Sequence, residues 1–326
     1  MKPIYLRTLC ALAMLFSLMT VHGQTRTMIE PGVSLSMAEQ RSDILSGITY
    51  NLSFTIPQDP AGNIDAVARI GFSLSDPSKP LQLDFRETAD HIRAVSVNAQ
   101  ESGFRFTNEH IVIPADELVT GSNEIRIEFT AGSTSLNRNP GFMYTLFVPD
   151  RARTAFPLFD QPNLKAVFEL SLILPPGWTA IAGAPLQGRR ETDRGVLHHF
   201  APTELISSYL FSFVAGKFET VKRNVGGREM IMLHRETDQE KVSRNIDDIF
   251  NLHAASLDWL EAYTGINYPY AQFGFALIPS HPYGGMEHTG AIQYNASRLF
   301  LEAAPSDPQL LRRANLIAHE VAHMWF

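Results

Sequence analysis

Cysteine is almost absent from this sequence, since Cys10 is the only one in 326 residues. It lies in an apolar run near the N-terminus, and no small-residue pattern that would indicate a lipid-anchored cysteine precedes it. One cysteine cannot form an intramolecular disulfide, so a disulfide framework is excluded. The stability of the fold therefore has to come from apolar cores, with bound metal as a further source.

Excess positive charge is also absent. The chain has 27 Lys and Arg against 34 Asp and Glu, a formal charge of −7, and no basic run. This balance excludes a general nucleic-acid-binding protein. Beyond residue 23, no stretch is long and apolar enough to cross a bilayer as a helix. The chain also has no internal repeat, no phosphate-binding glycine loop and no GxSxG elbow.

The first 23 residues have the pattern of a secretory signal peptide. Lys2 and Arg7 form a positive region, and the apolar run Leu9–Val21 that follows is too short to span a bilayer. Gly23 is a plausible cleavage point, with Gln24 as the new terminus. The sequence therefore predicts export to the periplasm or the extracellular space; the alternative is an uncleaved membrane anchor.

Period-two alternation of apolar residues extends from about residue 45 to residue 235. Turn residues separate the alternating runs, as in Gly121-Ser122-Asn123. This pattern predicts a mainly β domain over residues 24–235, an antiparallel sandwich or saddle rather than a βαβ fold. The expected strands are Ile48–Ile56, Ile64–Ser75, Ile92–Val97, His110–Ile113, Glu124–Thr130, Ala166–Leu174, Ser207–Val214 and Met230–Leu233.

Helical spacing of apolar residues begins near residue 237, so we place a domain boundary near Arg235. Thr237 or Asp238 can cap the first helix, and Gly265 can end it. A second helix is expected to start at Ser306-Asp307-Pro308 and to run to the end of the chain. Between the helices, the sequence predicts a strand over Phe273–Ile278 and a Gly-rich loop over His281–Gly290.

The second helix carries an HExxH sequence, from His319 through Glu320 to His323. Residues four apart lie on one helix face, so both imidazoles can reach one Zn²⁺ ion. The carboxylate of Glu320 can then take a proton from a water that attacks a carbonyl and pass it to the leaving amine. The competing interpretation is two solvated or core histidines. Because the surrounding residues are apolar, we expect a buried helix, where such side chains are costly unless they bind something.

Three further stretches precede the helix, and with it they resemble the aminopeptidase N family of gluzincins. The first, Gly284-Gly285-Met286-Glu287-His288, is similar to that family's Gly-x-Met-Glu-Asn loop. The others are Phe159-Asp160-Gln161-Pro162 with Lys165-Ala166 and Phe168, and Ser208-Tyr209-Leu210 continued through Phe213–Glu219. The four stretches stand in the family's order and cover most of residues 140–326. The resemblance implies a β saddle followed by the first part of an α+β thermolysin-like catalytic domain, over residues 236–326.

The resemblance also implies roles for individual residues. His319 and His323 correspond to zinc ligands and Glu320 to the general base of a metalloaminopeptidase. Glu287 corresponds to the carboxylate that holds the free α-amine of a peptide substrate, a charge-assisted contact that selects chain ends. The other loop residues implied in substrate binding are Gly284, Gly285, Met286 and His288, and the two glycines allow the backbone to approach a bound peptide.

Three departures from the family pattern affect these expectations. His288 stands where the family usually has Asn, which places a titratable group next to the amine site. The stretch Leu146-Phe147-Val148-Pro149 offers no carboxylate or amide where many members have a second amine anchor. The family's third zinc ligand, a glutamate, and its catalytic tyrosine fall beyond Phe326. We therefore expect the chain on its own to be inactive and to bind zinc weakly.

Other candidate residues are given structural interpretations. His198 and His199 are strand neighbours that point to opposite faces, so they are poorly placed to share an ion. His253 is expected in a core or an interface, and Asp160 is expected to fix a turn. Two sequons, at Asn51 and Asn295, fit the glycosylation pattern, which is a weak signal.

Two functional alternatives remain open beside the aminopeptidase. One is a zinc endopeptidase or an epoxide hydrolase of related fold, for which Glu287 would not read a free amine. The other is a non-catalytic secreted binding protein whose working part is the β domain. The expected partners are peptides with a free N-terminus; the sequence does not determine the oligomeric state.

Overall fold

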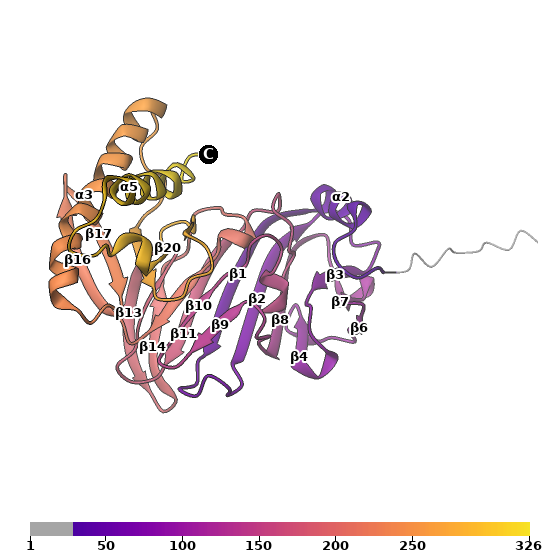
Figure 1. Ribbon diagram of the computed structural model, residues 1–326. Coiled ribbons are helices and arrows are strands. Elements are labelled where there is room, and N and C mark those ends of the chain that lie inside the picture. The colour runs from indigo at the N-terminus through magenta and orange to yellow at the C-terminus, as the bar shows by residue number, and fades with distance from the viewer. Residues whose placement is uncertain (1–28) are drawn as a thin grey trace, which may run out of the picture. The chain divides into compact units, whose positions relative to one another are not determined.

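Residues 29–326 are described in the computed structural model (Figure 1), in which Pro31–Phe326 forms one unit. The predicted signal peptide and its cleavage point lie outside the described residues, so export stays a prediction. Among the described residues, no helix has the length and apolar character needed to cross a membrane.

An eight-stranded sheet forms the largest part of the β region (Figure 1). Its central strand β1 pairs with β11 in parallel and with β2 in antiparallel orientation, so the expected all-antiparallel arrangement is wrong at one position. In order across the sheet, the strands are β13 (Leu186–Thr192), β14 (Gly195–Phe200), β11 (Val167–Leu174), β1 (Leu45–Thr55), β2 (Asp65–Leu74), β8 (Gly121–Thr130), β4 (Ile92–Val97) and β5 (Gln100–Glu101).

The alternation read from the sequence determines which face of this sheet is buried. Ile125, Ile127 and Phe129 of β8 have no exposed surface, whereas Arg126 and Glu128 between them are partly exposed. Aromatic side chains fill the core above this face; the ring of Phe54 contacts those of Phe129 and Phe156 edge to face, with centroids 6.5 and 6.2 Å apart. This core gives the β region its own apolar centre.

Two smaller sheets complete the β region. The four-stranded sheet contains, in order, β12 (Thr179–Ala182), β15 (Phe213–Gly216), β10 (Phe142–Thr145) and β9 (Leu136–Asn139). The three-stranded sheet contains β3 (Leu81–Asp84), β7 (His110–Ile113) and β6 (Arg105–Thr107). Short 3₁₀ turns connect the strands: η1 (Ala89–His91), η2 (Ala115–Glu117), η3 (Ala152–Thr154) and η4 (Ser208–Leu210).

The strand expected over Ser207–Val214 is wrong, because η4 occupies its first half. The hydroxyl of Ser207 donates to the carbonyl of Pro162 and that of Ser208 to the carboxylate of Asp160, both at 2.7 Å. These bonds favour a turn over an extended backbone. Asp160 also accepts from the backbone N–H of Arg153, so its predicted role in fixing a turn is confirmed.

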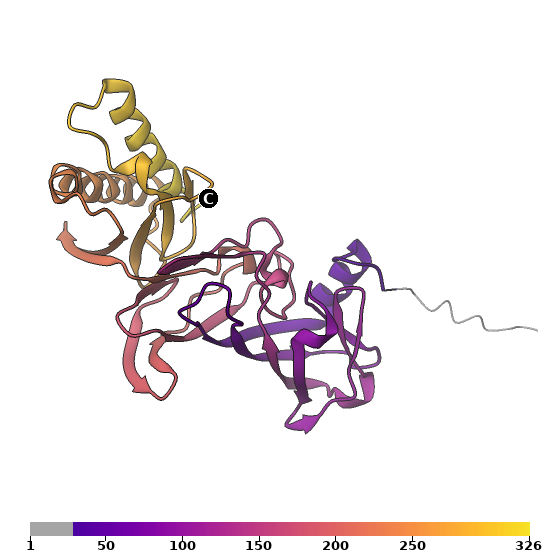
Figure 2. The ribbon, with the colours of Figure 1, turned by 60° about the horizontal axis from the view of Figure 1, so that its bottom comes forward.

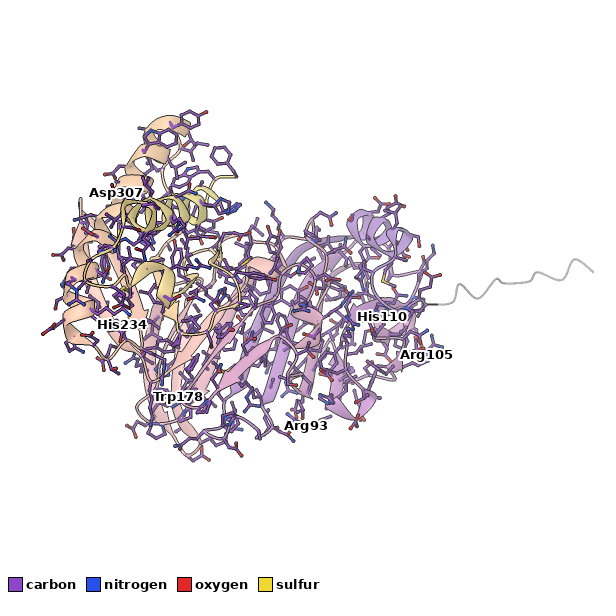
Figure 3. All side chains as sticks on the ribbon, in the orientation of Figure 1. Arg93, Arg105, His110, Trp178, His234 and Asp307 are labelled. Carbon is purple, nitrogen blue, oxygen red and sulfur yellow. The ribbon has the colours of Figure 1, made fainter. Side chains whose placement is uncertain are left out.

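An N-terminal helix that the sequence did not predict, α2 (Leu35–Ile44), is held by a buried ion pair. The guanidinium of Arg41 donates to both carboxylate oxygens of Asp84, at 2.7 and 2.8 Å. The ring of His110, labelled in Figure 3, lies 3.0 Å from the same carboxylate. Burial opposes ionisation of Asp84, but the charge of Arg41 and the bond from His110 outweigh it and hold its pKa below the usual range.

A five-stranded sheet with helices on one face forms the C-terminal region (Figure 2). Its strands, in order, are β16 (Glu219–Val225), β17 (Arg228–His234), β18 (Phe273–Ile278), β20 (Ile292–Asn295) and β19 (Gly285–Met286). The helices are α3 (Gln239–Thr264), α4 (Ala296–Leu299) and α5 (Asp307–Ala322). Along β17, Met230 and Met232 pack against the helices, while Ile231 and Leu233 belong to a third apolar cluster on the other face.

The predicted helix boundaries are largely confirmed. The side chain of Asp238 caps α3 by accepting from the backbone N–H of Lys241, and Gly265 ends the helix with φ 69°. The domain boundary near Arg235 stays a prediction; it falls between β17 and α3.

His198, His199 and His253 have structural positions, as the sequence predicts. His253 is fully buried between the carbonyl of Ile249 and the hydroxyl of Tyr294, at 2.8 and 3.1 Å, as expected for a core residue. His198 is buried, whereas the neighbouring His199 is 38% exposed, as alternation along β14 requires.

Candidate functional site

Helix α5 positions the HExxH residues, and its start follows from local sequence. Ser306 and Gln309 form a capping box in which the Ser306 N–H donates to the Gln309 side chain at 2.9 Å, and Pro308 lies in the first turn. Figure 3 labels Asp307 at this end of the helix. The expectation that the helix runs to the end of the chain is wrong, since it stops at Ala322 and His323 is its C-terminal cap.

The sequence predicts a buried helix, and within residues 29–326 α5 is buried along one face only. Ile317 and Val321 are fully buried against α3 and the sheet, whereas Leu311 is 69% exposed. Ala318 and His319 are exposed as well. The helix is therefore amphipathic, and the HExxH residues lie at the border between its buried and exposed faces.

The two histidines converge. The Nε2 atoms of His319 and His323 are 3.3 Å apart, and the rings stand at 85° to each other. Two nitrogen ligands about 2.0–2.1 Å from a zinc ion at a tetrahedral angle lie about 3.3–3.4 Å apart, so this pair has the separation that one zinc ion requires. Within residues 29–326, no cluster of three or more His, Cys, Asp or Glu suited to a metal is present, so a third protein ligand is not found there.

Glu320 lies between the two histidines in sequence and is directed into the protein. Its side chain is only 4% exposed. Burial, followed by the negative charge of Glu287, raises the pKa of Glu320 to about 7. A carboxyl with this pKa can both accept and release a proton near neutral pH.

The Gly-rich loop includes a short edge strand, β19, that runs next to Glu320. Gly285 and Met286 pair antiparallel with Tyr294 and Gln293 of β20. A β-carbon at Gly285 would overlap the carboxylate of Glu320. The sequence indicated that this glycine makes room for a peptide; the structure shows that it makes room for the Glu320 side chain.

Glu287 follows this strand and is half-buried near Glu320. Burial, with a smaller effect from the negative charge of Glu287, raises the pKa of Tyr209, a residue of η4. Met286, Val148 and Tyr209 belong to one apolar cluster. The stretch Leu146-Phe147-Val148-Pro149, which has no carboxylate, therefore lies on the same side of the sheet as the loop. Two neighbouring carboxylates, Glu287 and Glu320, make this region attractive to a cation.

His288 is fully buried, and its side chain does not carry a charge at neutral pH. Desolvation, with the nearby His281 adding a smaller effect, lowers the pKa of His288 to about 3. Among the described residues, neither of its ring nitrogens has a hydrogen-bond partner. The titratable group expected beside the amine site is therefore a neutral imidazole.

Two residues near the site were not identified from the sequence as site residues. Tyr294 of β20 lies close enough to Glu320 for the negative charge of Glu320, after burial, to raise its pKa well above the usual value. Tyr209 lies near Glu287. Tyr209 was part of a stretch that resembles the family, which is the signal that could have identified it, whereas Tyr294 had none beyond its place after the Gly-rich loop.

Comparison with known proteins shows what this chain is similar to. Residues 47–210 match the Peptidase M1 N-terminal domain, and residues 249–326 match the Peptidase family M1 domain. The chain is 26% identical over 314 residues to an aminopeptidase N of Streptomyces lividans, covering 91% of this chain and 36% of the relative. It is 28% identical over 287 residues to the human glutamyl aminopeptidase, covering 79% and 29%.

A third relative is a probable aminopeptidase 2 of Sulfurisphaera tokodaii, 32% identical over 184 residues, with 56% of this chain and 23% of the relative covered. The chain thus spans about a third or less of the length of these relatives. The two domain matches stand in the same order as the two structural regions, the β region first and the sheet with helices second. The chain therefore belongs to peptidase family M1, of which it contains the N-terminal domain and the beginning of the peptidase domain.

Proposed function

We propose that the whole protein is a zinc-dependent aminopeptidase that removes N-terminal residues from peptides. The observation that supports this most directly is the convergence of the His319 and His323 Nε2 atoms beside the buried Glu320, next to the strand that leads to Glu287. The names of the relatives, aminopeptidase N and glutamyl aminopeptidase, agree with this function. His319 and His323 would hold the metal, and a further ligand is expected from the rest of the protein.

In peptide hydrolysis, Glu320 would transfer the proton and Gly285 would make room for its carboxylate. A bound Zn²⁺ ion supplies Lewis-acid polarisation of the scissile carbonyl and lowers the pKa of water. Glu320, whose carboxylate is directed into the site, would accept the proton of the attacking water and return it to the leaving amine, so that its carboxylate is regenerated. Gly285 leaves the space in which the Glu320 carboxylate is held for both transfers.

Glu287 would select substrates by their free N-terminus. An α-ammonium group placed beside Glu287 and Glu320 offsets the repulsion between the two carboxylates. The stretch Leu146-Phe147-Val148-Pro149 adds no second carboxylate, and the nearby Asp150 is paired with Arg153, so Glu287 would be the main anchor of the amine. An endopeptidase of the same fold would not depend on this contact.

The test of the catalytic proposal is Glu320→Gln in the whole protein, with metal content measured beside turnover. We expect kcat to fall by about 10²–10⁴-fold because the general base is lost, while one equivalent of zinc remains because both histidines are present. His319→Ala is the matched variant, and it should lose the zinc. Near-normal turnover of zinc-loaded Glu320→Gln would exclude Glu320 as the base. Absence of hydrolysis in the unaltered protein would favour the binding-protein alternative.

We also propose that the protein is exported and that its mature form begins near Gln24. Lys2, Arg7 and the apolar run Leu9–Val21 support this. N-terminal sequencing of native material checks the prediction. Recovery of Met1 or Lys2 as the first residue would contradict it.

A further inference from the structure

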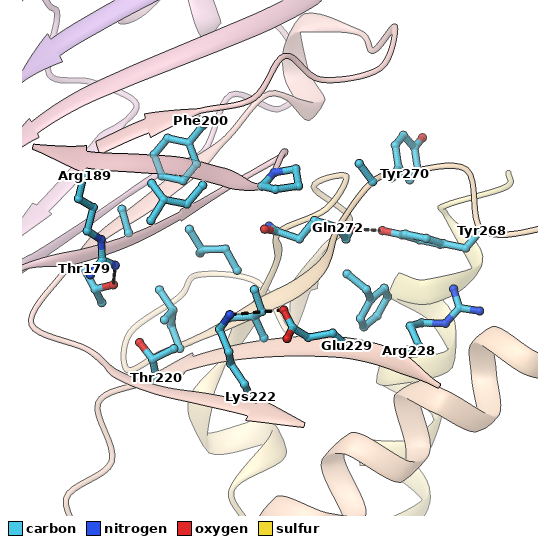
Figure 4. A pocket seen from close by; sticks show the side chains of 18 residues that line it. Thr179, Arg189, Phe200, Thr220, Lys222, Arg228, Glu229, Tyr268, Tyr270 and Gln272 are labelled. Carbon is cyan, nitrogen blue, oxygen red and sulfur yellow. Dashed lines mark hydrogen bonds and ion pairs between the residues drawn. The ribbon is translucent and has the colours of Figure 1, made fainter. Parts of the chain in front are cut away.

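A second cavity, of about 530 Å³, lies away from the HExxH site, between the strands of the N-terminal region and the C-terminal sheet (Figure 4). One wall is formed by β12, β13 and β14, which contribute Thr179, Arg189 and Phe200. The facing wall is formed by β16 and β17, and residues 268–273 close one side. Its volume is within the range of about 300–1,000 Å³ that is typical of small-molecule sites, which are often found where structural units meet.

The cavity is separate from the proposed peptidase site. Ile231 and Leu233 of β17 line it, whereas the alternate residues Met230 and Met232 face the helices that carry HExxH. In the five-stranded sheet, the cavity lies at the β16–β17 edge and the peptidase loop lies at the opposite edge, in β19. A ligand in the cavity would therefore contact neither Glu320 nor the two histidines.

Apolar and polar groups line the cavity in nearly equal parts, and its rim is charged. The accessible apolar part comes from the partly exposed side chains of Pro185, Leu186 and Ile231, while Ile181, Phe200 and Leu233 are buried in the walls. Of the charged side chains that line the cavity, three are basic and one is acidic; they are Arg189, Lys222, Arg228 and Glu229. This positive excess stands out in a chain whose formal charge is −7.

Two of the three basic side chains already have carboxylate partners. Arg228 donates to both oxygens of Glu261 at 2.8 Å, and Lys222 lies 3.4 Å from Glu229. Among the described residues, Arg189 has no carboxylate within ion-pair distance, and its one hydrogen bond goes to the hydroxyl of Thr179 at 3.2 Å. Arg189 is exposed at the rim, where the guanidinium donors not bonded to Thr179 face solvent (Figure 4).

We propose that this cavity binds a small carboxylate with an apolar body, whose carboxylate pairs with Arg189. An apolar group on the inner surface and a carboxylate at the rim would match the arrangement of the lining. Arginine presents a planar fork that suits a carboxylate, and such charge-assisted bonds are stronger than neutral ones. The inference does not depend on the proposed peptidase function.

The probes are N-acetyl-L-phenylalanine and its C-terminal amide, which share an apolar body and differ in the carboxylate. Acetylation removes the free α-amine, so neither probe has the group that Glu287 is proposed to read. Affinities are measured by calorimetry on the whole protein at low salt. We expect the acid to bind about two- to fivefold more tightly than the amide at low salt, the size of effect that one exposed ion pair produces. Arg189→Gln should abolish this preference.

Arg190→Gln is the matched control, because Arg190 is the next residue on β13 and is exposed like Arg189, but it is not part of the lining. It removes the same charge and should leave the preference for the acid unchanged. A zinc chelator should also leave binding unchanged. Equal affinity for the acid and the amide, no binding of the acid at millimolar concentration, or equal effects of Arg189→Gln and Arg190→Gln would each overturn the proposal.

Discussion

Arg41 and Asp84 illustrate how one pair of residues fixes an element. Their side chains are 1% and 0% exposed, and Asp84 also accepts a hydrogen bond from the backbone N–H of Asp160 at 2.8 Å. Removal of one partner would leave the other as an uncompensated buried charge. The pair of Arg93 and Asp65 has the same distance of 2.7 Å, but it is exposed and is made through one carboxylate oxygen only.

We expect Arg41→Ala to destabilise the protein by about 3–5 kcal/mol, and Arg93→Ala by about 1 kcal/mol or less. The difference arises because water replaces the lost partner at the exposed site and cannot do so at the buried one. Chemical denaturation of both variants measures it. If the two substitutions lower the free energy of unfolding by similar amounts, the burial of Asp84 does not increase the cost of removing its partner.

Glu287 permits a second residue-scale prediction. Glu287→Gln keeps the shape of the side chain and removes its charge, so kcat/KM for an unblocked leucyl anilide should fall by the equivalent of about 2–5 kcal/mol. An N-acetylated peptide has no ammonium to lose, and its turnover should change little. Glu302→Gln, on an exposed side chain, controls for net charge. If kcat/KM falls by the same factor for the blocked and the unblocked substrate, Glu287 does not bind the α-amine.

At the scale of elements, β19 and α5 depend on each other through Gly285. In Gly285→Ala the new β-carbon would overlap the Glu320 carboxylate, which is the mobile end of a side chain and can be displaced. We therefore expect kcat to fall at least tenfold, while the unfolding midpoint changes little. Gly188→Ala is the control, because no atom lies within 4 Å of its new β-carbon. Unchanged kcat in Gly285→Ala would mean that Glu320 is not held by this contact.

The elements that local sequence determines were predicted, and those that need distant partners were not. Helix α3 starts after Asp238 and ends at Gly265, and both residues bond to near neighbours in sequence. The two ends of the helix could therefore be predicted from the sequence. Helix α2 is amphipathic only weakly and depends on Asp84, 43 residues from Arg41, so no local signal marked it. The turn at η4 was missed for the same reason, since Ser208 is fixed by Asp160, 48 residues away.

The site shows the same division. The spacing of His319 and His323 predicts that they converge, because one helical turn brings them together. The neutral state of His288 could not be read from the loop, because segments distant in sequence desolvate it. The cavity beside Arg189 is assembled from strands of two regions, and no single stretch of sequence describes it.

Buried neutral histidines determine how the whole molecule responds to acid. His253 and His288 have pKa values lowered by desolvation to about 4 and about 3, below the usual 6.5. The unfolded chain therefore takes up their protons first, so their contribution to stability is present above pH 6.5 and is lost as the pH falls toward 4 and 3. Asp160, with a pKa raised by burial to about 6, acts in the opposite direction, since its contribution is present below its unfolded pKa and is lost as the pH rises through 6.

The variant His288→Asn isolates one of these contributions. When the pH falls from 7.5 to 4.5, the variant should lose about 2–3 kcal/mol less of its free energy of unfolding than the unaltered protein does. The reason is that the variant has no histidine at this position to take up a proton in the unfolded chain. His199→Asn, at a partly exposed strand position, is the control. Denaturation midpoints at the two pH values measure the change. A difference that is independent of pH would show that His288 is not held neutral by burial.

The parallel pairing of β1 with β11 has a consequence for how the chain reaches its folded state. Thr49 aligns with Val167, so the centre of the eight-stranded sheet joins segments more than 100 residues apart. β1 can form a hairpin with β2 early, but its other edge stays open until β11 has been synthesised. Contacts of this span slow folding, and an open edge invites pairing with other chains. A chain that crosses a membrane before folding would avoid this interval, because both strands become available together.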